Sequence, residues 1–300
     1  MMHVFYSPGY VSSGYSFDTT RKAKWIAESL TESLIPGISL IEPQPLTPEQ
    51  VAGVHDWQYI RAVETGAPRS LAESQGFSWD PGLWPMVLAS NGGAVAAALT
   101  ALEHGAAGSL SSGLHHARRY GGAGFCTFNG LVIAAREALA RGARAVLILD
   151  LDAHCGGGTQ SLIADDPRIW QVDVSVNEYD NYASSERTRL DIVGDGDEYL
   201  STVQRSLNDL TRRGPRFDLC LYNAGMDPDE RCSTGGKHGI TFDVLAAREQ
   251  TVFNWCRDRQ LPVAFVLAGG YVGPQLATSD LVDLHRLTLS AAGTALRHQV

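Results

Sequence analysis

The sequence lacks the features of a secreted, membrane-embedded or disulfide-stabilised protein. Its five cysteines are an odd number and include no Cys-x-x-Cys pair, which argues against a disulfide framework or a thiolate zinc cluster. The N-terminus has no basic stretch followed by an apolar run, so we expect no signal peptide. The most apolar stretch, residues 92–102, is shorter than the roughly 20 residues that span a bilayer. These absences predict a cytoplasmic protein without a membrane partner.

Positive charge is also scarce. The 300 residues include 24 Lys and Arg against 33 Asp and Glu, a formal net charge of −9. So acidic a chain has no broad electrostatic attraction for nucleic acid, and we expect no nucleic-acid partner. Hydrophobic residues make up 44% of the chain, which is enough to bury a large core. Because no repeat or long linker divides the sequence, we predict one domain over residues 1–300.

Short apolar, β-branched runs alternate with longer helical patterns along the chain. This alternation is typical of βαβ units and of a parallel sheet covered by helices on both faces. The expected strands are Arg144–Asp152, Ile169–Val176, Phe217–Ala224 and Pro262–Leu267. The expected helices are Thr20–Leu34, Pro85–Glu103, Gly130–Ala140, Tyr199–Arg212 and Val244–Arg259. The polar segment 177–196 is expected to be a loop.

Polar residues follow the carboxyl ends of these expected strands, where the sites of open α/β sheets lie. Asp150, Asp152 and His154 alternate along an extended backbone, so their side chains project to one face. Asp227 follows another strand and would add a second carboxylate to Asp152 and His154. Three such ligands with an open fourth position are typical of a catalytic zinc site. Taken alone, the Asp-x-Asp-x-His motif fits a hydrogen-bonded strand terminus equally well.

Two further groups suggest proton transfer and charge stabilisation. His115 and His116 are adjacent in a glycine-flanked segment, and imidazole titrates near neutral pH. Asp150 is the obvious partner to fix the tautomer of one of them. Tyr271 follows two glycines, and its hydroxyl could hydrogen-bond the oxyanion formed when water attacks an amide. Each feature also has an ordinary interpretation, as surface histidines or as a packed turn residue.

Together these motifs resemble the zinc-dependent histone deacetylase superfamily, which includes bacterial acetylpolyamine amidohydrolases and acetoin-utilisation-type proteins. Their form is most similar to the class IV branch, and they run from His55-Asp56 to Tyr271. The motifs, in order, are Gly113-Leu114-His115-His116-Ala117, Gly124-Phe125-Cys126-Thr127-Phe128-Asn129, Asp150-Leu151-Asp152-Ala153-His154, Asn223-Ala224-Gly225-Met226-Asp227 and Gly269-Gly270-Tyr271. The resemblance implies a three-layer α/β/α domain with a mainly parallel central sheet of about eight strands.

The resemblance also implies roles for individual residues. It assigns Asp152, His154 and Asp227 to one catalytic zinc ion. It assigns catalysis to His115 and His116, which activate water and protonate the leaving amine, and to Tyr271, which holds the substrate carbonyl. The implied reaction is hydrolysis of an N-acyl amide, with an acylated lysine or acylated small amine as substrate.

The remaining implied roles concern the substrate and a structural ion. Phe125 resembles a wall of the narrow acyl tunnel, with Gly124 beside it, and Gly269 and Gly270 are expected to line the substrate site. Asp150 would orient His115. Asp150, Ser175 and Val176 would contribute to a structural potassium site, together with the backbone carbonyls of Asp152 and His154.

The chain departs from the family pattern at several positions. Cys155 stands where many members carry a second histidine, and Asn177 replaces a common histidine. Gly157 stands where members carry the Asn or Asp that supports the second histidine of the pair, so we expect His116 to lack its usual partner. Residues 231–234 lack the usual sequence, which predicts an unusual pocket rim.

Three alternatives stay open at this stage. An arginase-like binuclear manganese hydrolase shares the fold, but it needs a carboxylate where this chain has Gly156. An acetylpolyamine amidohydrolase would draw its cationic substrate to an acidic surface. A catalytically weakened binding protein would explain Cys155 and Gly157.

Overall fold

The computed structural model describes residues 1–14 and 18–297, and its centre is a single eight-stranded sheet. The strand order is β2-β1-β3-β8-β7-β4-β5-β6, and every neighbouring pair is parallel. The strands are β1 (Met2–Phe5), β2 (Ile38–Ile41), β3 (Ala106–Ser109), β4 (Val146–Asp150), β5 (Ile169–Ser175), β6 (Thr188–Ile192), β7 (Leu219–Ala224) and β8 (Val263–Leu267). The predicted α/β fold with a parallel sheet of about eight strands is therefore confirmed.

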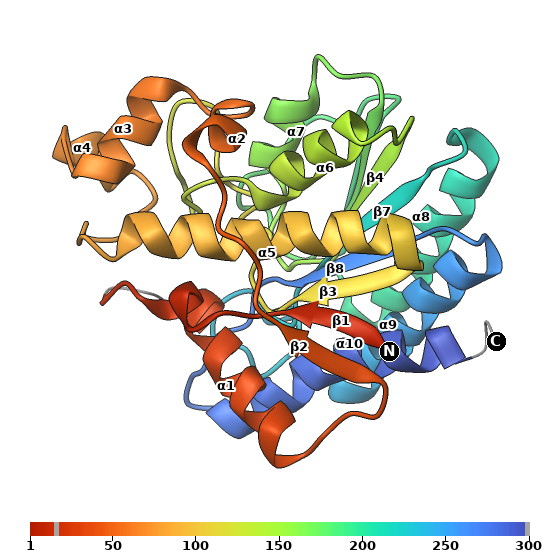
Figure 1. The fold of residues 1–300 in the computed structure, drawn as a ribbon. Coiled ribbons are helices and arrows are strands. Elements are labelled where there is room, and N and C mark those ends of the chain that lie inside the picture. The colour runs from red at the N-terminus through yellow and green to blue at the C-terminus, as the bar shows by residue number, and fades with distance from the viewer. Residues whose placement is uncertain (15–17, 298–300) are drawn as a thin grey trace.

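Helices cover the two faces of the sheet as separate layers (Figure 1). One layer contains α5 (Leu83–His104), α6 (Gly130–Ala140) and α7 (Gly157–Ile163), with α2 (Pro48–Ala52), α3 (Trp57–Thr65) and α4 (Arg69–Ala72) beyond them. The other layer contains α1 (Asp18–Glu32), α8 (Tyr199–Arg213), α9 (Phe242–Asp258) and α10 (Thr278–Arg297). Two short 3-10 turns, η1 (Pro8–Val11) and η2 (Gly196–Glu198), complete the elements.

Each face of the sheet has its own apolar core, because successive side chains of a strand point to opposite faces. In β4, Val146 and Ile148 pack into the core beneath α5 and α6. Leu147 and Leu149 pack into the core beneath α8, α9 and α10. All four side chains are fully buried, as expected for a parallel strand covered on both sides.

The four predicted strands correspond to β4, β5, β7 and β8, and the five predicted helices correspond to α1, α5, α6, α8 and α9. One prediction was wrong: segment 177–196 contains β6, which pairs with β5. As an edge strand β6 is only partly buried, so its sequence, Thr-Arg-Leu-Asp-Ile, lacks a continuous apolar run.

Helix α5 is longer than the apolar stretch recognised in the sequence. Its 22 residues are long and apolar enough to cross a membrane by length and composition, which alone is weak evidence. However, 67% of its apolar window is buried in the fold, where α5 packs on β3, β8 and α6. We therefore describe α5 as a core helix of the α/β domain.

Candidate active site

The residues singled out by sequence lie in loops that follow the carboxyl ends of neighbouring strands. His115 and His116 follow β3, Tyr271 follows β8, and Asp227 follows β7. Asp150 ends β4, and the loop after it carries Asp152 and His154. Since β3, β8, β7 and β4 are adjacent in the parallel sheet, these loops converge at one edge.

Asp152, His154 and Asp227 form a buried cluster of potential metal ligands. His154 Nδ1 lies 3.1 Å from Asp152 Oδ1 and 3.1 Å from Asp227 Oδ2. Within residues 1–14 and 18–297, this is the one group of three or more His, Cys, Asp or Glu side chains with ligand atoms that all lie within 4.8 Å of one another. Two carboxylates and an imidazole are ligands that zinc accepts.

The surroundings of the cluster also fit a cation. Backbone amides of Gly269 and Ala153 donate to Asp152 Oδ2 and Asp227 Oδ1, at 2.7 and 3.0 Å. These bonds fix both carboxylates, while Asp227 Oδ2 is buried and, among the described atoms, accepts no hydrogen bond of good geometry. A Cβ on Gly269 would lie 2.1 Å from Asp227 Oδ2, so the glycine leaves space for that carboxylate.

Negative charge is concentrated in this buried cluster. Burial, followed by the neighbouring Asp152, raises the pKa of Asp227 to about 6. Lys22 of α1 is fully buried nearby; its burial lowers its pKa to about 7, although Asp227 and Asp152 act in the opposite direction. A bound divalent cation would relieve the repulsion between the two carboxylates.

The carboxylates beside His115 favour its protonated form. Its Nδ1 lies 2.8 Å from Asp150 Oδ2, and its Nε2 lies 3.6 Å from Asp152 Oδ1. Burial opposes protonation, yet Asp150 and Asp152 raise the pKa of His115 to about 10. Asn223 Nδ2 donates to Asp150 Oδ1 at 2.8 Å and so fixes the carboxylate that contacts His115.

His116 has a carboxylate partner, contrary to the expectation drawn from Gly157. Its Nδ1 lies 2.9 Å from Oδ2 of Asp180, in the loop after β5. Donation from Nδ1 leaves Nε2 as the acceptor of the neutral ring. Burial and the positive charge of His115 lower the pKa of His116 to about 4, despite Asp180. Asp180 was missed because it lies 64 residues from His116 and in no recognised motif.

Tyr271 is buried beside the candidate metal ligands Asp152 and Asp227. Burial first, and then the charges of Asp227 and Asp152, raise its pKa well above the ordinary value for tyrosine. The phenol is therefore neutral and able to donate. Gly270, with φ of 153°, precedes it, and a Cβ there would lie 2.7 Å from Nε2 of the buried His285.

Aromatic rings flank the histidines. Tyr179 packs edge-on against His116, with ring centroids 4.9 Å apart, and was not recognised in the sequence. A Cβ on Gly124 would lie 2.5 Å from the His116 ring and 3.0 Å from Tyr179. The next residue, Phe125, packs against Phe77 with ring centroids 5.2 Å apart. These contacts bring Gly124 and Tyr179 to the same side of His116.

The residues predicted to bind potassium also lie at the strand ends, but their role stays a prediction. Asp150 is fully buried, as is Ser175 at the end of β5. The Ser175 hydroxyl donates to Asp173, and Val176 N donates to Ala153 O at 2.9 Å.

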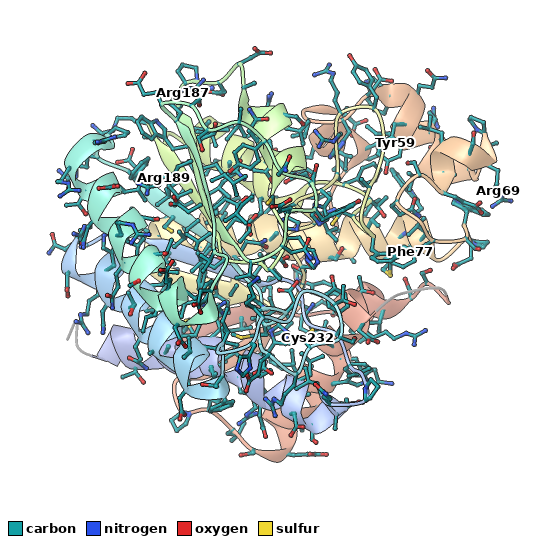
Figure 2. The ribbon with its side chains drawn as sticks, turned by 180° about the vertical axis from the view of Figure 1, so that it is seen from behind. Tyr59, Arg69, Phe77, Arg187, Arg189 and Cys232 are labelled. Carbon is teal, nitrogen blue, oxygen red and sulfur yellow. The ribbon has the colours of Figure 1, made fainter. Side chains whose placement is uncertain are left out.

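A cavity of about 760 Å³ lies away from these residues, between β5, β6 and α8. Figure 2 shows two of its lining residues, Arg187 and Arg189, in the left half of the view, whereas Tyr59 and Phe77 lie in the right half. Arg189 is paired with Asp191 at 2.6 Å and with Asp209. The cavity contains none of the predicted site residues.

Comparisons with known proteins agree with this fold and this set of residues. The histone deacetylase domain family matches residues 16–284. An uncharacterized protein of Picosynechococcus sp. is 34% identical over 270 residues, which cover 84% of this chain and 88% of that protein. Histone deacetylase 2 of Arabidopsis thaliana is 26% identical over 290 residues, which cover 90% of this chain and 74% of that protein. Acetoin utilization protein AcuC of Bacillus subtilis is 27% identical over 294 residues, which cover 89% of this chain and 73% of that protein.

Solved structures share the same architecture. An acetylpolyamine aminohydrolase from Burkholderia pseudomallei superposes with a TM-score of 0.81 at 20% identity, over 98% of this chain and 99% of that one. The HD domain of HDA15 superposes with a TM-score of 0.76 at 19% identity, over 99% and 94%. At these identities the likeness shows the fold.

Fold, strand-end residues and relatives together define a deacetylase-like hydrolase. The chain belongs to the histone deacetylase family. Membership supports an amidohydrolase activity, and it confirms the family resemblance drawn from the motifs. The roles of individual residues are taken up below as proposals.

Proposed function

We propose that the protein is a zinc-dependent deacylase that hydrolyses the N-acyl amide of an acylated lysine or an acylated small amine. The observation that carries the proposal is a buried Asp152, His154 and Asp227 cluster beside two histidines, of which His115 favours the protonated form and His116 the neutral form. Amide hydrolysis needs an activated water, a group that accepts and returns its proton, and stabilisation of negative charge. This set of residues offers all three.

Zinc held by Asp152, His154 and Asp227 would polarise the amide carbonyl and lower the pKa of a water molecule. The two carboxylates and one imidazole, and the buried Asp227 Oδ2 that accepts no hydrogen bond of good geometry among the described atoms, support this assignment. One ion is favoured over an arginase-like pair of manganese ions, since Gly156 stands where the second site would need a carboxylate. Metal content per chain distinguishes the two cases.

His116 is the group suited to proton transfer. Its low pKa keeps the ring neutral at pH 7, so Nε2 accepts a proton from water and returns it to the leaving amine. Asp150 lies 2.8 Å from Nδ1 of His115 and favours the protonated ring, whose charge would stabilise the negative oxygen of the tetrahedral intermediate. The neutral Tyr271 phenol donates a hydrogen bond to the same oxygen. The two histidines can take different roles because burial and neighbouring charges lower the pKa of one and raise the pKa of the other.

The proposed substrate class is based on the aromatic residues near His116 and on the net negative charge of the chain. Tyr179, which packs on His116, and Phe125 would offer aromatic rings to an acyl chain, and the lack of a side chain at Gly124 avoids a clash with His116 and Tyr179. The net charge of −9 attracts both polyamines and Lys-rich peptides. An acetylpolyamine amidohydrolase is therefore the alternative. A binding protein without activity is less favoured, because His116 has a partner that Gly157 could not provide.

A substrate panel tests the proposal. Zinc-loaded protein would be assayed for release of free amine from acetyl-lysine peptides, longer acyl-lysine peptides and acetylpolyamines. We expect hydrolysis that a hydroxamate chelator abolishes and that His116→Ala lowers by about 10²- to 10⁴-fold. The exposed His104 gives a matched control, His104→Ala, with unchanged turnover. Failure to hydrolyse every acylated amine, or full activity of His116→Ala, would overturn the proposal.

A further inference from the structure

We propose that Asp180 is a positioning residue for His116. Arg118 holds the Asp180 carboxylate in place, and the absence of a side chain at Gly157 leaves the space that the carboxylate occupies. The inference rests on the proposed deacylase function and deepens it. It assigns the support of the second histidine to the loop after β5, rather than to the first turn of α7, where Gly157 lies.

The contact between Asp180 and His116 is short and shielded from water. His116 Nδ1 donates to Asp180 Oδ2 at 2.9 Å, and the two side chains are 6% and 9% exposed. Such a bond fixes which ring nitrogen carries the proton and how the ring is turned. Tyr179 packs on the same ring from the adjacent chain position, so one short segment sets both its tautomer and its packing.

Asp180 is itself held from several directions. Gly158 N donates to its Oδ2 at 3.0 Å, and Arg118 Nη2 donates to its Oδ1. Arg118 Nη1 also donates to Gly157 O at 3.2 Å, so the guanidinium connects the first turn of α7 with the loop after β5. Burial opposes ionisation, but His116 and Arg118 hold the pKa of Asp180 below its usual range. The carboxylate thus has donors on both oxygens.

Gly157 explains why the carboxylate can reach this position. A Cβ on residue 157 would lie 2.3 Å from the Asp180 carbonyl oxygen and 2.7 Å from its Oδ1. Real Cβ atoms do not approach other atoms so closely, so any side chain at 157 would displace the loop. The position of the Asp180 carboxylate therefore depends on the absence of a side chain at residue 157.

Removal and rescue of the carboxylate test the inference. Asp180 has φ of 60°, a conformation that glycine adopts without strain, so Asp180→Gly removes the side chain with little cost to the backbone. In the zinc-loaded enzyme we expect kcat to fall about 10- to 100-fold with KM changed less than about threefold. Asp180→Asn should recover kcat to the level of Arg118→Met, about three- to tenfold below wild type, because its amide oxygen still accepts from Nδ1 while its NH2 group cannot accept from Arg118.

Two controls separate positioning from flexibility. Asn181 is exposed in the same loop, and Asn181→Gly should leave kcat within about twofold of wild type. Arg118 is 47% exposed, so Arg118→Met should fold normally; loss of its hold on Asp180 should lower kcat about three- to tenfold. The Arg118 variant keeps the inference testable if Asp180→Gly does not fold.

A structural measurement makes the test independent of activity. The ¹⁵N resonances of the His116 imidazole should report a protonated Nδ1 in wild type and a mixture of tautomers in Asp180→Gly. If the wild type hydrolyses no acylated amine, the deacylase proposal fails while this spectrum still decides the role of Asp180. Wild-type kcat in Asp180→Gly, an unchanged tautomer, or an equal loss in Asn181→Gly would each overturn the inference.

Discussion

His115 and His116 are neighbours in sequence and have opposite protonation preferences. Both rings are buried, which alone disfavours the charged form. His115 overcomes this cost because it faces two carboxylates, and its pKa rises to about 10. His116 faces one carboxylate and the charge of His115, so its pKa falls to about 4. In the proposed mechanism, His115 would therefore supply a positive charge and His116 a base that is unprotonated at neutral pH.

The Tyr271 phenol provides the first prediction at this scale. Replacing Tyr271 by phenylalanine removes one hydrogen-bond donor and leaves the ring in its buried site. We expect kcat to fall about 10²- to 10³-fold, because one donor to the oxyanion is lost. Steady-state kinetics on zinc-loaded protein measures the change.

Tyr120 is 68% exposed, so Tyr120→Phe is the matched control and should leave kcat unchanged. Zinc content and melting temperature of Tyr271→Phe should equal those of wild type. Full turnover in Tyr271→Phe would show that the oxyanion is stabilised without this residue.

His55 gives a prediction for the pH dependence of stability. Its Nδ1 lies 2.9 Å from Arg118 O, and Asn129 N donates to its Nε2 at 2.9 Å, so the buried ring is neutral. Burial lowers its pKa from 6.5 to about 4. Between pH 6.5 and 4 the unfolded chain therefore binds a proton at His55 more readily than the folded protein does. Protonation of His55 leaves the free energy of unfolding unaffected above pH 6.5 and decreases it as the pH falls toward 4. The loss should reach about 3 kcal/mol in the free energy of unfolding.

Urea unfolding at several pH values from 7 to 4 measures this effect. His55→Gln should lower stability at pH 7 and flatten the decline on acidification, whereas His104→Gln on the surface of α5 should do neither. An equally steep decline in His55→Gln would show that other groups cause the acid sensitivity.

At the scale of elements, a buried polar network supports the strand ends that carry the candidate metal ligands. Arg248 of α9 is fully buried and donates to Leu151 O at 3.2 Å, between Asp150 and Asp152. It also pairs with Glu249 at 2.7 Å, and Tyr222 of β7 donates to Glu249 at 2.6 Å. These bonds connect helix α9 to the end of β4 and to β7.

Removing Arg248 should therefore weaken the fold. Arg248→Met keeps most of the side-chain volume but leaves Glu249 buried without its charge partner. We expect a loss of about 3–5 kcal/mol in the free energy of unfolding. Urea denaturation measures it, with Arg144→Met as control, since the Arg144–Asp218 pair is exposed and should contribute little. Wild-type stability in Arg248→Met would mean that the network does not support these strands.

The sequence predicts long elements and strand-end motifs better than short elements and distant partners. Strands β4, β5, β7 and β8 are apolar runs of five to seven residues, which are distinctive. Strand β3 is four small residues, Ala-Ala-Gly-Ser, and nothing in that composition favours a strand. The Asp152, His154 and Asp227 cluster could be anticipated from alternation and chain order. Asp180 could not, because its contact with His116 depends on how a loop folds over Gly157.

At the scale of the whole molecule, the parallel sheet explains why one site can draw on so many segments. Five neighbouring strands, β3, β8, β7, β4 and β5, end at the same edge and deliver the histidines, Tyr271, the ligand residues and Asp180. The two apolar cores hold the strands from both faces, so the loops start from rigid points. The formal net charge of −9 would attract the cationic acylated amines proposed as substrates.

Crystals grown with zinc, measured above and below the zinc absorption edge, would locate the metal within this arrangement. We expect one anomalous peak per chain, about 2.0–2.2 Å from a ligand atom of each of Asp152, His154 and Asp227. Zinc should be absent from crystals of Asp227→Asn grown in the same way. A peak away from these residues, two peaks at the site, or none at saturating zinc would contradict a single zinc centre at the strand ends.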